Sequence, residues 1–295
     1  MQFSLGKIKP HVGWLALPFA LVFFAYFVLP LVLTIIVSFW DYTDYAIIPD
    51  FIFDNYIYIF EGCLSNEGGL CLTFKTYLST FFFCFFTWLI TLVLGFCVAY
   101  FLAFYVNSIP LQVCLFLVCT IPFWTSNVIR MVSWIPLLGR NGLVNEFFLS
   151  LGIIDQPIEW LLYSSFSVIL ALVHLYTLFM IVPIFNSMIR IDRSIVEAAY
   201  DAGASHRQII FNIIIPLSKT GIIIGSIFVV TVVMGDFLTI GIMGGQQLAS
   251  VGKIINTEMN YLQFPGAAAN AVILLIITIF IIYVMTKFID IRKEL

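Results

Sequence analysis

Titratable side chains are rare in the long apolar stretches of this sequence, and those that occur there are the first candidates for chemistry. They are Arg130, His174 and Asp236. An ionisable group in an apolar environment is costly, so it usually lines an ion or solute path or makes a charge pair. We expect Asp236 either to line such a path or to make a structural bond to Arg130 or to another chain. His174 is more typical of a packing or hydrogen-bonding residue than of a ligand.

Aromatic side chains form a second group of candidates, because a rigid aromatic face attracts a cation. Trp124 and Asn127 follow Pro122, which disfavours a regular helix, and Tyr176 lies centrally in its apolar stretch. We expect these residues to be candidates for contact with a solute, whereas most other aromatic side chains face lipid or pack. Arg130 is expected about one helical turn from the outer surface, where it either snorkels outward or pairs with an acid.

Motifs of enzyme active sites are missing from the sequence. It contains no G-x-x-x-x-G-K-[ST] loop for ATP phosphates, no H-E-x-x-H, no C-x-x-C metal pair and no G-x-S-x-G. We therefore expect no catalytic residue, no metal site and no cofactor in this chain.

The composition defines the class of protein that must position these residues. Of the 295 residues, 62% are hydrophobic and 10% are charged, and the formal net charge is −3. Soluble domains are about 25% charged, and disordered chains are poor in apolar residues. Because there is no surplus of basic residues, we expect no binding to nucleic acid. The class that remains is an all-α polytopic membrane protein.

The charge-poor runs predict six transmembrane helices, since a spanning helix needs about 20 apolar residues. The break between the second and the third helix is placed at Asn107-Ser108-Ile109-Pro110, where proline removes a backbone donor. The first run is about twice as long as the apolar core of a signal peptide, so we expect a retained helix. The predicted helices are 14–39, 77–105, 111–134, 162–188, 217–242 and 265–288.

Basic residues near the ends of spanning helices mark the cytoplasmic side. With both termini in the cytoplasm, loop 190–217 is cytoplasmic and loop 40–76 is external. The basic residues then expected inside are Lys7, Lys9, Arg190, Arg193, Arg207, Lys219, Lys287, Arg292 and Lys293, against Lys75, Arg140 and Lys253 outside.

Two of the six cysteines, Cys63 and Cys71, lie in the predicted external loop, and the other four lie in predicted helices. The small and polar residues between the two allow a tight reversal that brings their Cα atoms within disulfide distance. An oxidising exterior favours the bond. We expect Cys63 and Cys71 to be joined; two free thiols in a mobile insertion are the alternative.

The cytoplasmic loop 190–217 predicts two short helices joined by a tight turn. Each is expected to begin with a capping box, at Ser194–Glu197 and at Ser205–Gln208. Gly203 is well placed as a left-handed helix stop, and Pro216 is expected to end the second helix. Such a pair of helices either lies on the inner leaflet of the membrane or inserts into a cleft of a partner.

The spacing within this loop favours insertion into a partner. Glu197-Ala-Ala-Tyr-Asp-Ala-Gly203, nine further residues and Ile213-Ile-Ile-Pro216 resemble the EAA---G---------I-LP loop of ABC importer permeases, with Ile215 in place of the usual Leu. From about Trp14 to the C-terminal end the chain also resembles permeases of spermidine/putrescine importers. This wider similarity is carried by 121–134, 141–155, 243–245 and 265–268. The departures are an apparent insertion at 61–72 and Phe264 in place of a frequent Trp.

The resemblance implies a type I permease fold, formed as a single transmembrane domain over residues 1–295 in the bacterial inner membrane. It also implies a homologous second permease, an ATPase dimer that holds ATP and Mg, and a periplasmic solute-binding protein. The two permeases would form the path for a polyamine; an opine, an amino-acid-like solute or ferric ion is the alternative. A secondary transporter or channel is a different class, which has no use for the cytoplasmic loop. The residues expected to couple to the ATPase are Ser194, Glu197, Ala198, Ala199, Asp201 and Gly203.

Overall fold

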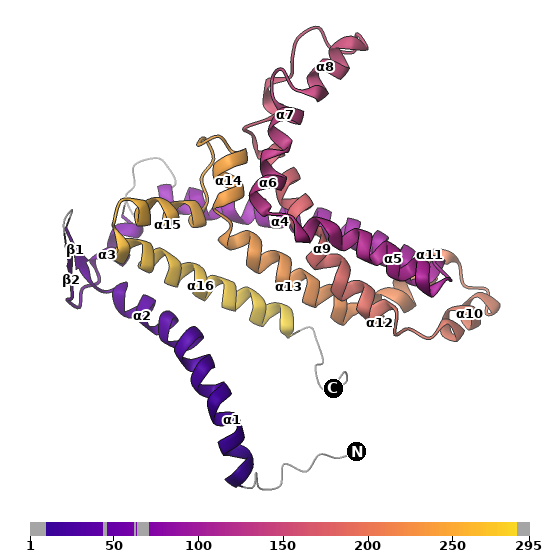
Figure 1. Ribbon diagram of the computed structural model, residues 1–295, viewed down its shortest axis with the longest axis horizontal. Helices are drawn as coiled ribbons and strands as arrows, with labels where there is room; N and C mark the ends of the chain where they lie inside the picture. The colour runs from indigo at the N-terminus through magenta and orange to yellow at the C-terminus, as the bar shows by residue number, and fades with distance from the viewer. Residues whose placement is uncertain (1–9, 44–45, 62, 64–70, 288–295) are drawn as a thin grey trace. The chain divides into compact units, whose positions relative to one another are not determined.

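The computed structural model describes residues 10–43, 46–61, 63 and 71–287. In these residues nearly all regular structure is helical, as expected for an all-α membrane protein (Figure 1). Contacts divide the chain into two compact units, Met1–Ser65 with Ile255–Ile273 and Asn66–Ile254 with Leu274–Leu295. The helices α15 (Val251–Asn260) and α16 (Phe264–Thr286) each contribute to both units, because a boundary falls within each of them.

The first unit begins with a long helical stretch and continues with short elements. These elements are α1 (Pro10–Phe23), the π-helical turn η1 (Phe24–Val28), α2 (Leu29–Val37), the antiparallel strands β1 (Asp41–Tyr42) and β2 (Ile47–Ile48), and α3 (Asp54–Ile59). The side-chain amide of Asn55 donates to the carbonyl oxygens of Ser38 at 3.0 Å and of Trp40 at 2.8 Å. The buried Asn55 therefore satisfies backbone carbonyls that the end of α2 leaves without a helical partner.

The second unit contains most of the helices. They are α4 (Leu72–Tyr100), η2 (Phe101–Tyr105), α5 (Ile109–Thr120), η3 (Ile121–Trp124), α6 (Asn127–Val132), α7 (Trp134–Leu138), α8 (Leu143–Ser150), η4 (Glu159–Leu161), α9 (Ser165–Met188), α10 (Arg193–Asp201), α11 (His206–Ile209), η5 (Ile210–Ile214), α12 (Ile215–Leu217), α13 (Lys219–Gly235) and α14 (Leu238–Met243), with the adjoining parts of α15 and α16. Figure 1 shows α10 and α11 at one end of α9 and α14 towards the other end.

The core of the second unit is the mutual packing of α4, α9 and α13. The helices approach closely where side chains are small: a Cβ atom at Gly225 would lie 2.9 Å from the sulfur of Met180. Buried threonines on α4 donate to carbonyl oxygens one turn earlier, as Thr80 does to Thr76 at 2.9 Å. Close approach through small residues and satisfied hydroxyl groups are what helix association in an apolar medium requires. These three helices hold the candidate sites at their two ends.

By length and composition, the residues that the structure describes contain four to six helical stretches that could cross a membrane. Four helical stretches are long and apolar enough to cross a membrane, namely Ala16–Val37, Leu72–Tyr105, Glu159–Met188 and Phe264–Thr286. Two further stretches are bent pairs: Ile109–Trp124 with Asn127–Ser150 at 91°, and His206–Leu217 with Lys219–Gly235 at 68°. Each of the six predicted helices thus has a helical counterpart, but the third and the fifth are interrupted.

Two predicted helix boundaries lie at prolines, Pro110 and Pro216. The predicted break at Asn107–Pro110 is confirmed, because the helix ends at Tyr105 and α5 begins at Ile109 with Pro110 in its first turn. The helix of the cytoplasmic loop ends at Leu217, one residue after Pro216 and close to the predicted end. Pro216 directly follows the π-helical turn η5, so the missing proline N–H falls where the helix is already irregular.

Candidate functional site

The first helix of the cytoplasmic loop, α10, begins at a different cap from the predicted one. The N-cap is Asp192, whose carboxylate accepts from the backbone N–H of Ser194 at 3.0 Å. The Ser194–Glu197 capping box is therefore wrong, because α10 begins at Arg193 and Ser194 already lies inside its first turn. The hydrogen bond from Ser194 lowers the pKa of Asp192.

The end of α10 is the predicted left-handed glycine stop. Gly203 has φ +83°, and no atom lies within 4 Å of a Cβ placed on it. The N–H of Gly203 donates to the Tyr200 oxygen at 2.9 Å, and the N–H of Ala204 donates to the Ala199 oxygen at 3.0 Å. This pair of bonds is a Schellman motif, which sets the direction of the chain after the helix. Glycine is therefore needed here for its backbone conformation and not for space.

The predicted coupling residues lie on an accessible helix. No residue of α10 is buried, and Ser194, Glu197, Ala198, Asp201 and Gly203 are all exposed, with Ala199 half-buried. The second capping box is confirmed, since Ser205 and Gln208 bond each other's backbone N–H groups at 3.4 and 2.8 Å. The loop thus presents its small residues outward and satisfies its polar backbone groups internally.

Two contacts that the sequence motif does not reveal hold α10, one to the segment after α4 and one to α11. The guanidinium of Arg193 donates to the Asn107 side-chain oxygen at 2.6 Å and to the Ala103 carbonyl at 3.3 Å. The hydroxyl of Tyr200 and Nδ1 of His206 are 2.9 Å apart. Ala103 and Asn107 follow α4, so Arg193 joins the start of α10 to the segment that follows a core helix.

Asp236 lies at a break between helices and not within one continuous helix 217–242, as the sequence predicts. It follows α13 as its C-cap, and one of its carboxylate oxygens accepts from the N–H of Thr239 at 2.9 Å. The other oxygen accepts from the hydroxyl groups of Tyr176 at 2.6 Å and Thr239 at 2.6 Å. An aspartate favours such a break because its carboxylate replaces backbone acceptors for the following turn.

A second segment of backbone approaches the chain closely beside Asp236, at Gly252. A Cβ atom on Gly235 would meet nothing within 4 Å, whereas one on Gly252 would lie 2.8 Å from the Gly235 carbonyl oxygen. The N–H of the neighbouring Val251 donates to the Thr80 hydroxyl on α4 at 3.0 Å. The chain after α14 is thus tied both to the break at Asp236 and to the core.

The other predicted path residues are only partly brought together. Tyr176 is buried, and it is the one predicted path residue that bonds Asp236 in the described part of the chain. Trp124 is 83% exposed on the turn η3, and no hydrogen bond or ring contact among the described residues joins it to Asp236. Asn127 is exposed and accepts from the guanidinium of Arg130.

Arg130 neither snorkels outward nor pairs with an acid among the described residues. It is 8% exposed, and its Nε atom has no hydrogen-bond partner there. The single ion pair of the described residues joins Arg140 and Glu159 at 3.6 Å. Asp236 and Arg130 therefore do not form the structural bond that we considered. His174 has the hydrogen-bonding role that the sequence favours, because its Nδ1 accepts from the Trp134 indole at 3.1 Å.

Cys63 and Cys71 are both disulfide-bonded, and the four helix cysteines are free. Cys71 is also the N-cap of α4.

We predict that neither Cys63 nor Cys71 takes up an alkylating label in the denatured, non-reduced protein. Cys97 and Cys114 serve as internal controls that label without reduction. Closing so short a loop contributes on the order of 2–3 kcal/mol in the chain-entropy model. Mass spectrometry that finds label on both Cys63 and Cys71 without reduction would overturn this prediction.

Comparison with known proteins assigns the chain to a family. No protein-family model matches it. The spermidine/putrescine transport system permease protein PotB of Salmonella typhimurium (strain SL1344) is 34% identical over 279 residues, which cover 94% of this chain and 90% of the relative. The chain belongs to the PotB family of transport permeases.

A second PotB permease and a solved transporter extend this result. PotB of Escherichia coli (strain K12) is 38% identical over 188 residues, 63% of this chain and 67% of the relative. In the crystal structure of a bacterial alginate ABC transporter in complex with an alginate pentasaccharide-bound periplasmic protein, one chain matches with a TM-score of 0.69. That chain is 15% identical, and the match covers 94% of this chain and 92% of that one. The PotB-family chain therefore has an ABC importer permease fold, as the sequence predicts.

Proposed function

We propose that the chain is the permease subunit of an ATP-driven importer for a polyamine. The observation that carries this proposal is the similarity to PotB, which extends over 94% of the chain. The half-buried carboxylate of Asp236 adds support, because a carboxylate in an apolar surrounding offsets the desolvation of an ammonium group. The chain holds no site of its own for ATP in this proposal, and a partner subunit hydrolyses it.

The proposed arrangement places six spans in the bacterial inner membrane, with both termini in the cytoplasm. The distribution of basic residues supports this orientation. The accessible helix α10 then faces the cytoplasm, where it inserts into an ATPase dimer that binds ATP and Mg. On the opposite side a periplasmic binding protein delivers the solute. A second, homologous permease completes the path, and Trp124 and Asn127 are candidates to line it together with Tyr176 and Asp236.

The geometry at Asp236 suggests how an amine is accepted. The carboxylate is half-buried, and its bonds to Tyr176 and Thr239 are hydrogen bonds from neutral donors. An ammonium group that reaches Asp236 makes a charge-assisted bond, which is about twice as strong as a neutral one. The ammonium group therefore displaces the Tyr176 hydroxyl, while the Thr239 N–H continues to hold the carboxylate in place.

The experiment that tests the function is uptake by the reconstituted importer. We expect spermidine or putrescine uptake that requires ATP, is abolished by vanadate and is insensitive to a proton ionophore. Competition by an opine, by amino acids or by ferric ion identifies the alternative solutes. Uptake that persists without ATP and stops with the ionophore would contradict the proposal and indicate a secondary transporter.

A further inference from the structure

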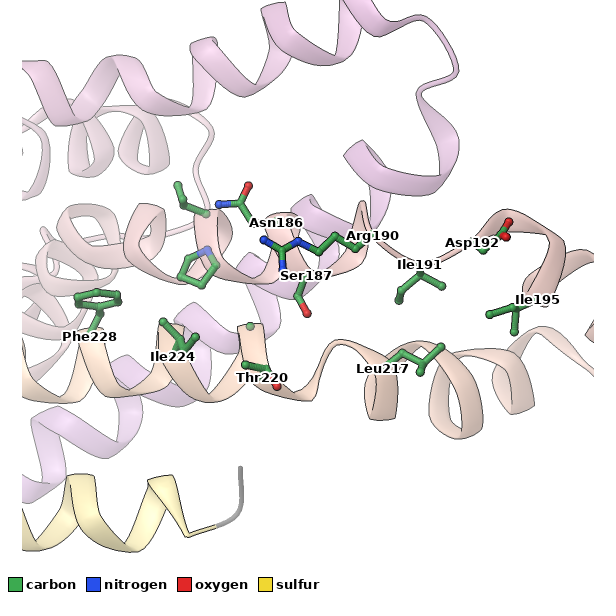
Figure 2. A pocket seen from close by; sticks show the side chains of 13 residues that line it. Asn186, Ser187, Arg190, Ile191, Asp192, Ile195, Leu217, Thr220, Ile224 and Phe228 are labelled. Atoms are coloured by element: carbon green, nitrogen blue, oxygen red, sulfur yellow. The ribbon is translucent and has the colours of Figure 1, made fainter. Parts of the chain in front are cut away.

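An amphipathic groove of about 630 Å³ runs along the seam between α9 and α13 and reaches the start of α10. Figure 2 shows its lining side chains in order along the seam. The first part is apolar, with Phe228 and Ile224. The middle part is polar, with Ser187, Thr220 and the guanidinium of Arg190, and the last part contains Ile191, Leu217 and the carboxylate of Asp192.

Arg190 and Asp192 are charged groups with free bonding capacity. Both side chains are exposed, and no ion pair joins them in the described part of the chain. Figure 2 shows the Arg190 guanidinium turned towards Asn186 and Ser187 and the Asp192 carboxylate turned away from it. Asp192 accepts one backbone N–H, which leaves further lone pairs of its two oxygens open. The groove therefore presents a cation and an anion at separate points beyond an apolar wall.

We propose that this groove binds one phospholipid with an ethanolamine headgroup. The order of groups in such a lipid is acyl chain, phosphate and ammonium, and the order along the groove is apolar wall, guanidinium with hydroxyl groups, and carboxylate. Arg190 is suited to the phosphate, because its planar donors match phosphate oxygens. Asp192 accepts the N–H groups of the ammonium. The apolar side chains of α9 and α13 cover the acyl chain.

The position of the groove gives the lipid a role in coupling. Asp192 is the N-cap of α10, and Ile195 of the same helix also lines the groove. Val182 and Ile224 belong to the core helices α9 and α13. A lipid bound here joins α10 to the core helices and restricts the motion of α10. This inference depends on the membrane location of the chain and not on which solute is imported.

The test is a lipid titration of the importer complex isolated from membranes, delipidated and examined by native mass spectrometry. The probes are phosphatidylethanolamine, phosphatidylcholine and phosphatidylglycerol with identical acyl chains, and glycerophosphoethanolamine without acyl chains. We expect one phosphatidylethanolamine to bind about tenfold more tightly than phosphatidylcholine, whose quaternary ammonium has no N–H for Asp192. A tenfold factor is that expected for one hydrogen bond to a charged group. The headgroup without acyl chains is expected to bind far more weakly.

Two variants separate the parts of the site. Arg190→Gln is expected to weaken all three lipids by about tenfold, because each carries a phosphate. Asp192→Asn is expected to weaken only phosphatidylethanolamine, and asparagine keeps the helix cap. The matched control is Lys219→Gln, since Lys219 is exposed at the start of α13 but does not line the groove. The proposal is overturned if the three lipids bind equally or if Arg190→Gln binds them as the wild type does. It is also overturned if the wild-type complex takes up no stoichiometric lipid because a second subunit covers the groove.

Discussion

Replacing Gly203 with valine is expected to abolish ATP-driven uptake while the chain still inserts into the membrane. Gly203 is held at φ +83°, and a β-branched residue in the left-handed region costs about 1–3 kcal/mol. This strain is relieved most easily by opening the two bonds that end α10, from Gly203 to Tyr200 and from Ala204 to Ala199. The chain direction after α10 then changes, and the helix no longer presents its small residues to the ATPase. Uptake and vanadate-sensitive ATPase activity of the reconstituted importer measure the effect.

Two matched variants isolate the coupling role of Gly203 from general strain. Gly152 also has a positive φ, +66°, and no atom lies within 4 Å of a Cβ placed on it, but it follows α8 far from the loop in sequence. Gly152→Val therefore imposes the same kind of strain and is expected to keep uptake. Gly203→Asn is expected to keep most of it, because asparagine tolerates the left-handed conformation. If Gly203→Val retains its ATPase partner and transports as well as Gly152→Val, the coupling role of this turn is wrong.

Local sequence patterns were sufficient to predict helix ends and caps where the deciding interaction lies within a few residues. The break at Asn107–Pro110, the Ser205–Gln208 capping box and the left-handed Gly203 all depend on near neighbours, and the structure confirms them. The start of α10 shows the limit of this reasoning. Two residues that can cap a helix, Asp192 and Ser194, lie two positions apart, and the structure begins the helix after Asp192. The start of α10 is also held by the bond from Arg193 to Asn107, 86 residues away in sequence, which no local pattern reveals.

The site at Asp236 was located in the sequence but not understood from it. A lone acid in an apolar run marks an important position, yet hydropathy does not distinguish one continuous helix from two helices that meet at the acid. The partner that reveals the arrangement is Tyr176, 60 residues earlier in the chain. Tyr176 was itself chosen for its aromatic ring, whereas the structure shows that its hydroxyl group makes the contact. Side chains that meet only through the packing of α9 against α13 require the fold to be known.

Replacing Asp236 with asparagine is expected to raise the half-saturation concentration for polyamine uptake by about tenfold or more. A hydrogen bond to a charged group contributes about 1.5–3 kcal/mol, and 1.4 kcal/mol corresponds to a factor of ten in affinity. The asparagine side-chain oxygen still accepts from the Thr239 N–H, so the break between α13 and α14 is kept and the protein assembles. Uptake as a function of polyamine concentration, measured with substrate-stimulated ATPase activity, gives the half-saturation value.

The variant Tyr176→Phe distinguishes solute binding from a structural role of this carboxylate. It removes the 2.6 Å hydrogen bond to Asp236 but keeps the aromatic ring and the charge. If an ammonium group has to displace the Tyr176 hydroxyl, Tyr176→Phe lowers the half-saturation concentration, whereas Asp236→Asn raises it. If the bond between the two side chains only supports the fold, both variants lower the amount of assembled importer and leave the half-saturation of the remainder unchanged. Opposite shifts therefore place Asp236 in the solute path, and a wild-type half-saturation in Asp236→Asn removes it from that path.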